Sequence, residues 1–154
     1  MAGTGVGEHK LQEAVAGHFE RRGFVVLREV QFFTKRIDLF AVNRSSLVTV
    51  AIEAKVHNWK RALEQARASL LCADYVYVAL PVPLAFGKVV EDAGKGQVGV
   101  LGIEVAGDSP REWDVVVTSP ARLSTIRKEQ YLDRMRGITL FSKFEMGRVS
   151  ENAN

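Results

Sequence analysis

The chain has little of what stabilises a secreted or membrane-spanning protein. Its 154 residues include one cysteine, Cys72, so no internal disulfide can form, and no group of Cys and His has zinc-binding spacing. No apolar run approaches the roughly eighteen residues that a membrane-spanning helix needs. Residues 1–10 lack the basic and apolar regions of a secretory signal. We therefore expect a reduced, soluble protein of the cytoplasm that has no membrane partner.

Neither sign of charge dominates the composition. The chain has 21 Lys and Arg against 18 Asp and Glu, and 47% hydrophobic residues, which excludes a disordered chain. The net charge of +3 lies entirely in the segment after Pro120, which has seven basic and four acidic residues. This mild basicity permits nucleic acid as a partner without requiring it. The length fits a single domain over residues 1–154.

Hydrophobic periodicity predicts an alternation of helices and strands. Helices are expected at 8–22, 58–72 (with Asn58 as N-cap), 84–92 and about 120–136, the last being basic and followed by a polar tail to 154. Strands are expected at 24–33, 36–42, 47–55, 74–81, 98–106 and 112–120, with a hairpin turn at 43–46. The order αβββαβ over about 8–81, then a looser αββα, predicts an α/β domain with a mixed sheet flanked by helices.

Three charged residues interrupt the predicted strands. Asp38 lies inside the apolar strand 36–42, and Glu53 and Lys55 end the strand 47–55. Strand alternation places Glu53 and Lys55 on one face. If Val42 faces Leu47 across the turn, Asp38 faces Ala51 and lies one diagonal step from Glu53, close enough for both carboxylates to share a cation. A turn changed by one residue would reverse that parity.

Glu8 is a further candidate for this acidic group. It lies three residues before Leu11 and seven before Val15, so it projects from the core-facing side of the first helix. The alternative is a glutamate placed there only because negative charge is favourable at a helix N-terminus.

Carboxylates and a lysine on one face of a sheet suit a particular chemistry. Hard oxygen ligands bind Mg²⁺ or Mn²⁺, and a nearby lysine can act on a metal-bound water. A metal so placed stabilises charge on a phosphate, as phosphodiester hydrolysis requires. The alternative is an ordinary ion pair at a strand end.

The motif Asp38, fourteen intervening residues, then Glu53-Ala54-Lys55 resembles the D…(D/E)-x-K signature of the PD-(D/E)XK nuclease superfamily. The likeness covers about residues 8–81, although Ile37 replaces the proline before Asp38. The resemblance implies a restriction-endonuclease-like fold and metal-dependent cleavage of DNA. It implies Asp38, Glu53 and the Ala54 carbonyl as metal ligands with help from Glu8, and Lys55 acting on the nucleophilic water. Gln65 resembles a glutamine that lines the site in many members; the alternative is an exposed helix residue.

Nearby residues are candidates for holding nucleic acid. Trp59, Lys60 and Arg61 open the predicted helix 58–72, where a helix N-terminus and two cations suit a phosphate. Trp59 could instead belong to the core. Lys35 and Arg36 precede Asp38 and could follow the DNA backbone, or could simply be solvated surface.

These observations favour a Mg²⁺- or Mn²⁺-dependent DNA endonuclease of repair, recombination or defence, possible subtypes including Holliday junction resolvases. Since the chain is small, specificity would come from DNA structure, a homodimer or a partner protein, and strands 98–106 and 112–120 could form the dimer surface. Two alternatives stay open: a non-catalytic nucleic-acid-binding or assembly module on the same fold, and a small structural α/β protein.

Overall fold

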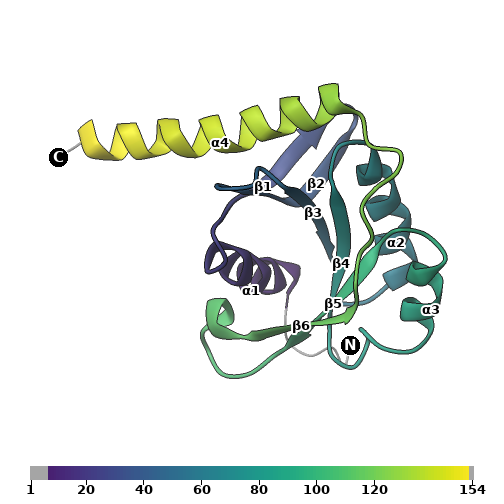
Figure 1. Ribbon diagram of the computed structural model, residues 1–154. Helices are drawn as coiled ribbons and strands as arrows, with labels where there is room; N and C mark the ends of the chain where they lie inside the picture. The colour runs from purple at the N-terminus through teal and green to yellow at the C-terminus, as the bar shows by residue number, and fades with distance from the viewer. Residues whose placement is uncertain (1–6, 153–154) are drawn as a thin grey trace.

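A six-stranded mixed sheet forms the centre of the molecule in the computed structural model, which describes residues 7–152 and side chains as far as residue 142 (Figure 1). The strands lie in the sheet in the same order as in the chain, β1 to β6. Strands β1 to β3 form an antiparallel meander, β3 to β5 are parallel, and β6 is antiparallel to β5. The elements are α1 (Glu8–Glu20), β1 (Phe24–Phe32), β2 (Lys35–Asn43), β3 (Thr49–Ala54), α2 (Trp59–Ala68), the 3₁₀ turn η1 (Ser69–Leu71), β4 (Tyr75–Pro81), α3 (Lys88–Gly94), β5 (Gly99–Glu104), the 3₁₀ turn η2 (Pro110–Glu112), β6 (Asp114–Ser119) and α4 (Glu129–Asn152).

Each face of the sheet carries its own apolar cluster. Helix α1 covers one face, where Leu11 is buried in one cluster with Leu39 and Ile52. Helices α2 and α3 cover the other face, where Leu63 is buried in a second cluster with Phe40 (Figure 1). Neighbouring residues of β2 therefore point to opposite cores, which is why its four consecutive residues 39–42 are all apolar. The predicted α/β class, with a mixed sheet flanked by helices and an αβββαβ core, is confirmed.

The β2–β3 hairpin has the predicted parity but a different register. Val42 pairs with Thr49, not with Leu47, and Phe40 takes the place opposite Ala51 that was expected for Asp38. The turn is longer than expected because Asn43 Oδ1 accepts hydrogen bonds from the backbone N–H groups of Ser45 and Ser46. The register shifts by two residues, so every side chain keeps its face. Continued by one residue, it places Asp38 opposite Glu53 rather than diagonal to it.

Two helix predictions had the wrong boundaries. The short helix expected at 84–92 is α3, which begins at Lys88. The basic helix expected at about 120–136 begins at Glu129 and continues through the expected polar tail to Asn152. Residues 120–128 are held in an irregular path by hydrogen bonds from backbone N–H groups, including Ser124 to the Asp74 carbonyl and Lys128 to the Leu71 carbonyl. Helix α4 projects beyond the sheet in Figure 1, and no helix within residues 7–152 has the length and apolar character to cross a membrane.

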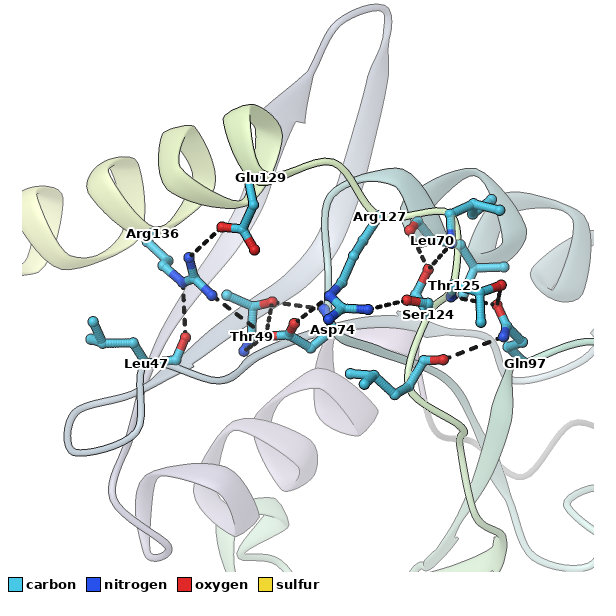
Figure 2. A network of polar contacts seen from close by, with 12 residues as sticks. Leu47, Thr49, Leu70, Asp74, Gln97, Ser124, Thr125, Arg127, Glu129 and Arg136 are labelled. Carbon is cyan, nitrogen blue, oxygen red and sulfur yellow. Dashed lines mark hydrogen bonds and ion pairs between the residues drawn. The ribbon is translucent and has the colours of Figure 1, made fainter.

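A buried acid fastens α4 to the body of the protein. Asp74 Oδ2 accepts hydrogen bonds from Thr49 N (2.9 Å) and Thr49 Oγ1 (3.0 Å) at the start of β3. Arg127 Nε lies 3.1 Å from Asp74 Oδ1, and Arg136 of α4 lies 3.8 Å from Oδ2 and donates to the Leu47 carbonyl (Figure 2). Two basic residues of the C-terminal segment, Arg127 and Arg136, therefore form intramolecular ion pairs.

Candidate metal and phosphodiester site

Asp38 and Glu53 meet where the β2–β3 ladder ends. The last paired residues are Leu39 and Ile52. Beyond them, Asp38 Oδ2 accepts a hydrogen bond from Ala54 N (2.9 Å), and Asp38 N donates to Glu53 Oε2 (3.4 Å). Each carboxylate therefore bonds a backbone N–H of the opposite strand, in place of the next pair of ladder bonds. This reciprocal arrangement fixes both acids on neighbouring strands.

Both acids have raised pKa values. Burial raises the pKa of Glu53 to about 8, and the charge of Asp38 adds to the shift; the Asp38 N–H, Lys35 and Lys55 offset it in part. Burial likewise raises the pKa of Asp38, against the hydrogen bond from Ala54 N. Glu53 is only 3% exposed. A buried and a half-buried carboxylate with so little compensating positive charge are costly to ionise together, and a bound cation would remove that cost.

Lys55 lies between this acidic pair and Glu8. It follows the last residue of β3, and its backbone N–H continues the sheet by donating to the Ala79 carbonyl of β4. Its Nζ lies 3.8 Å from Glu8 Oε1, while its charge lowers the pKa of Asp38 and Glu53. The charge of Glu8 also raises the pKa of Asp38. Glu8, Asp38, Glu53 and Lys55 therefore form one electrostatically coupled group.

Gln65 faces the interior and is not an exposed helix residue. Its Oε1 is fully buried and has no hydrogen-bond partner among the described residues. Lys35 Nζ donates to the Gln65 backbone carbonyl (3.2 Å) and lowers the pKa of Glu53 by its charge. A buried amide oxygen without a donor is unfavourable, so this part of the site is built for a donor or a cation.

The remaining predicted phosphate-binding residues lie at the edge of the site. Asn58 is the N-cap of α2, as predicted, and accepts from Arg61 N. Trp59 packs partly against the core, with Lys60 Nζ 5.7 Å from its ring centroid. Lys60 and Arg61 are exposed. Arg36 is exposed and pairs with Glu29 at 3.6 Å.

Glu29 is a site residue that sequence reasoning did not identify. It lies between the Arg28–Leu39 and Val30–Ile37 pairs, across from Asp38, and has a positive φ of 56°. Its charge contributes to the raised pKa of Asp38. The only signal in the sequence is a further charge inside the apolar strand 24–33.

The donor set fits a hard divalent cation only in part. Two carboxylates on adjacent strands, with the Ala54 carbonyl between Glu53 and Lys55 in the chain, match the oxygen ligands that Mg²⁺ and Mn²⁺ prefer. Within the described part of the chain, however, no three Asp, Glu, His or Cys side chains are grouped closely enough to hold a metal. Glu8 pairs with Lys55 instead of completing such a group. Since Mg²⁺ usually keeps several waters, one or two carboxylates suffice for it.

Comparisons with known proteins reveal fold similarity. No protein-family model and no curated protein matches the chain. Among solved structures, the SPO1766 protein of unknown function from Silicibacter pomeroyi aligns with a TM-score of 0.63 and 18% identity, over 96% of this chain and 91% of that one. A protein of unknown function, AF1548, aligns over 62% of this chain and 58% of that one (TM-score 0.49, 18% identity). SfsA of Pyrococcus furiosus, solved in complex with Ca²⁺, aligns over 74% and 64% (TM-score 0.41, 10% identity). The chain therefore shares its fold, over nearly its whole length, with the Silicibacter protein.

Proposed function

We propose that this protein is a divalent-metal-dependent DNA nuclease that hydrolyses phosphodiester bonds. The observation that carries the proposal is the Asp38–Glu53 pair, held by reciprocal hydrogen bonds at the end of two strands with Lys55 beside it. A purely structural role explains it poorly, because placing a half-buried acid beside a buried one raises both pKa values and costs stability. The ordered motif Asp38, Glu53, Lys55 further supports membership of the PD-(D/E)XK superfamily.

The chain's own residues divide the work of the reaction. Asp38, Glu53 and the Ala54 carbonyl would hold Mg²⁺ or Mn²⁺. When bound, the ion supplies Lewis-acid stabilisation of charge on the phosphate and lowers the pKa of a coordinated water. Lys55 orients the attacking water and the scissile phosphate. Glu8 forms an ion pair with Lys55 and so favours one direction of its ammonium group.

Residues around the site would hold the DNA backbone. Lys60 and Arg61 are exposed at the start of α2, where free backbone N–H groups and two cations favour a phosphate. Lys35 and Arg36 lie at the start of β2, shortly before Asp38, and would bind the next phosphates along the DNA strand. These contacts are independent of base sequence, so the protein would recognise DNA structure or gain sequence specificity elsewhere.

A second copy or a partner protein would supply part of that specificity. The apolar residues of β5 are buried within the sheet, and of the strand expected at 98–106 the exposed large apolar residue is Val105, which follows β5. Strand β6 is at the sheet edge, and Val117 on it is 53% exposed. An edge strand offers unpaired N–H and C=O groups to another chain, and we propose β6 as the homodimer contact.

The decisive experiment uses Asp38→Asn and Glu53→Gln, with Glu64→Gln as a matched control on the exposed face of α2. Single-stranded, duplex, flapped and four-way DNA are incubated with Mg²⁺, Mn²⁺ or EDTA. We expect cleavage of at least one substrate by wild type and Glu64→Gln with metal, none in EDTA, and none by the two site variants, which should still bind DNA. Salt-dependent DNA binding without cleavage of any substrate would instead favour a non-catalytic binding module.

A further inference from the structure

The tip of the β1–β2 hairpin carries an aromatic residue where neither burial nor backbone geometry favours one. Phe32 pairs with Lys35, so the turn consists of Phe33 and Thr34. Phe33 has a φ of 54°, in the left-handed region that a bulky side chain rarely adopts, and it is 56% exposed. Glycine or asparagine would fit this turn without strain. The backbone conformation of the turn therefore does not explain a phenylalanine at this position.

The ring of Phe33 is nevertheless held in a defined orientation. It contacts Phe32 and Tyr131 edge-to-face, with centroid distances of 4.8 Å and 5.4 Å, and those two rings also contact each other. The backbone of the turn is fixed as well, because Gln31 Nε2 donates to the Phe33 carbonyl at 2.6 Å. An exposed aromatic ring that is already ordered can bind a flat ligand with little further loss of entropy.

One cation lies over this ring and two more follow it in the chain. The Arg134 guanidinium lies 5.8 Å from the ring centroid, and Lys35 and Arg36 follow the turn directly. Lys35 also connects the tip to the acidic pair, because it bonds the Gln65 carbonyl and its charge acts on Glu53. An aromatic face interleaved with cations is the pattern that binds unpaired bases and their phosphates.

We propose that Phe33 is the stacking platform for an unpaired base of the DNA substrate, with Lys35, Arg36 and Arg134 neutralising the adjacent phosphates. The inference rests on the proposed function and narrows its substrate class to DNA with unpaired bases, such as flaps, overhangs or junctions. In the interior of an intact duplex both faces of each base are covered by neighbouring bases, so no interior base can stack on Phe33. The platform lies five residues before Asp38, about 17 Å at the rise of a strand.

The test measures binding in EDTA, so it does not depend on cleavage. The probes are a duplex with a single-stranded overhang that contains 2-aminopurine, whose fluorescence falls on stacking, and a blunt duplex of equal length. Phe33→Gly relieves the positive φ but also removes the contacts with Phe32 and Tyr131, so its melting temperature serves to establish that the variant is folded. We expect it to weaken overhang binding about tenfold or more. Blunt-duplex affinity should change less than twofold, and Phe33→Trp should retain the wild-type affinity and the fluorescence change.

Leu47→Gly is the matched control. Leu47 is also an apolar hairpin residue with positive φ (64°) and 44% exposure, but it lies in the turn at the other end of β2. It should bind both probes as wild type does. If Phe33→Gly loses the same affinity for both probes, or loses none for either, the inference is overturned even if wild type cleaves DNA. Phe33-dependent overhang binding by a wild type that never cleaves supports the inference and refutes the nuclease proposal.

Discussion

Replacing Glu53 with glutamine should stabilise the metal-free protein, and increasingly so as the pH rises. The pKa of Glu53 is about 8 in the folded protein against 4.5 for an ordinary glutamate, mainly because the side chain is buried. Between these values the folded state holds a proton that the unfolded state has lost. The contribution of Glu53 to stability is thus fully present below about pH 4.5 and is lost as the pH rises towards 8.

The expected size follows from the two pKa values. Each unit of pKa difference is worth about 1.4 kcal/mol. Since pH 7 lies well above 4.5 and just below 8, the free energy of unfolding of wild type at pH 7 should be about 3 kcal/mol lower than that of Glu53→Gln. Glutamine cannot ionise, yet its side-chain oxygen can still accept the hydrogen bond from Asp38 N. The substitution therefore removes the titration and keeps the contact.

Urea denaturation of both proteins in EDTA, from pH 5 to pH 8, measures this difference directly. Adding Mg²⁺ should restore wild-type stability at pH 7 to 8, because a bound cation favours the ionised pair, and should not affect Glu53→Gln. Glu64→Gln, which alters an exposed acid, should follow wild type throughout. If wild type and Glu53→Gln show parallel stability profiles over this pH range, ionisation of Glu53 does not destabilise the folded protein as we expect.

Three further predictions address the site, the attachment of α4 and the assembly. Lys55→Ala should lower the cleavage rate at saturating DNA by about 100-fold or more with little change in Kd, whereas Lys60→Ala/Arg61→Ala should mainly weaken binding and reduce its salt dependence; full recovery of Lys55→Ala at saturation would contradict this division. Asp74→Ala should lower the free energy of unfolding by about 3 kcal/mol in urea denaturation, because it leaves Thr49 and two arginines without their acceptor; a change below about 1 kcal/mol would show that α4 is held otherwise. Light scattering of wild type should give twice 17.0 kDa, and Val117→Lys should return it to the monomer mass by charging the β6 edge; a wild-type monomer with and without DNA would refute the dimer.

The strand pattern was sufficient to predict that Asp38 and Glu53 lie on one face, because alternate residues of a strand point to the same face of the sheet. The pattern could not give the register, which depends on how Asn43 caps the turn and on the left-handed conformation of Leu47. The error of two residues left both acids on the expected face. It also hid the reciprocal hydrogen bonds, which need Asp38 and Glu53 directly opposite each other.

Features that depend on distant contacts could not be read from the sequence. Helix α4 begins at Glu129 because residues 120–128 are bonded to Asp74, Leu71 and Gln97, which lie far earlier in the chain. The buried oxygen of Gln65 depends on how α2 packs on the sheet, which periodicity does not specify at the level of one atom. The Phe33 platform combines a turn with a helix that is about a hundred residues later in the chain.

The sequential strand order of the sheet has a consequence for how the protein folds. Each strand pairs with the strand that precedes it in the chain, so the sheet can grow by adding one strand at a time without inserting any strand between two others. Such a topology has few pairings between distant segments, and the entropy of closing each connection is small. The hairpin that carries Asp38 and Glu53 needs only residues up to Ala54 for its pairing. During synthesis the site's scaffold can thus form before β5, β6 and α4 have left the ribosome, and these later elements add stability to a site that is already arranged.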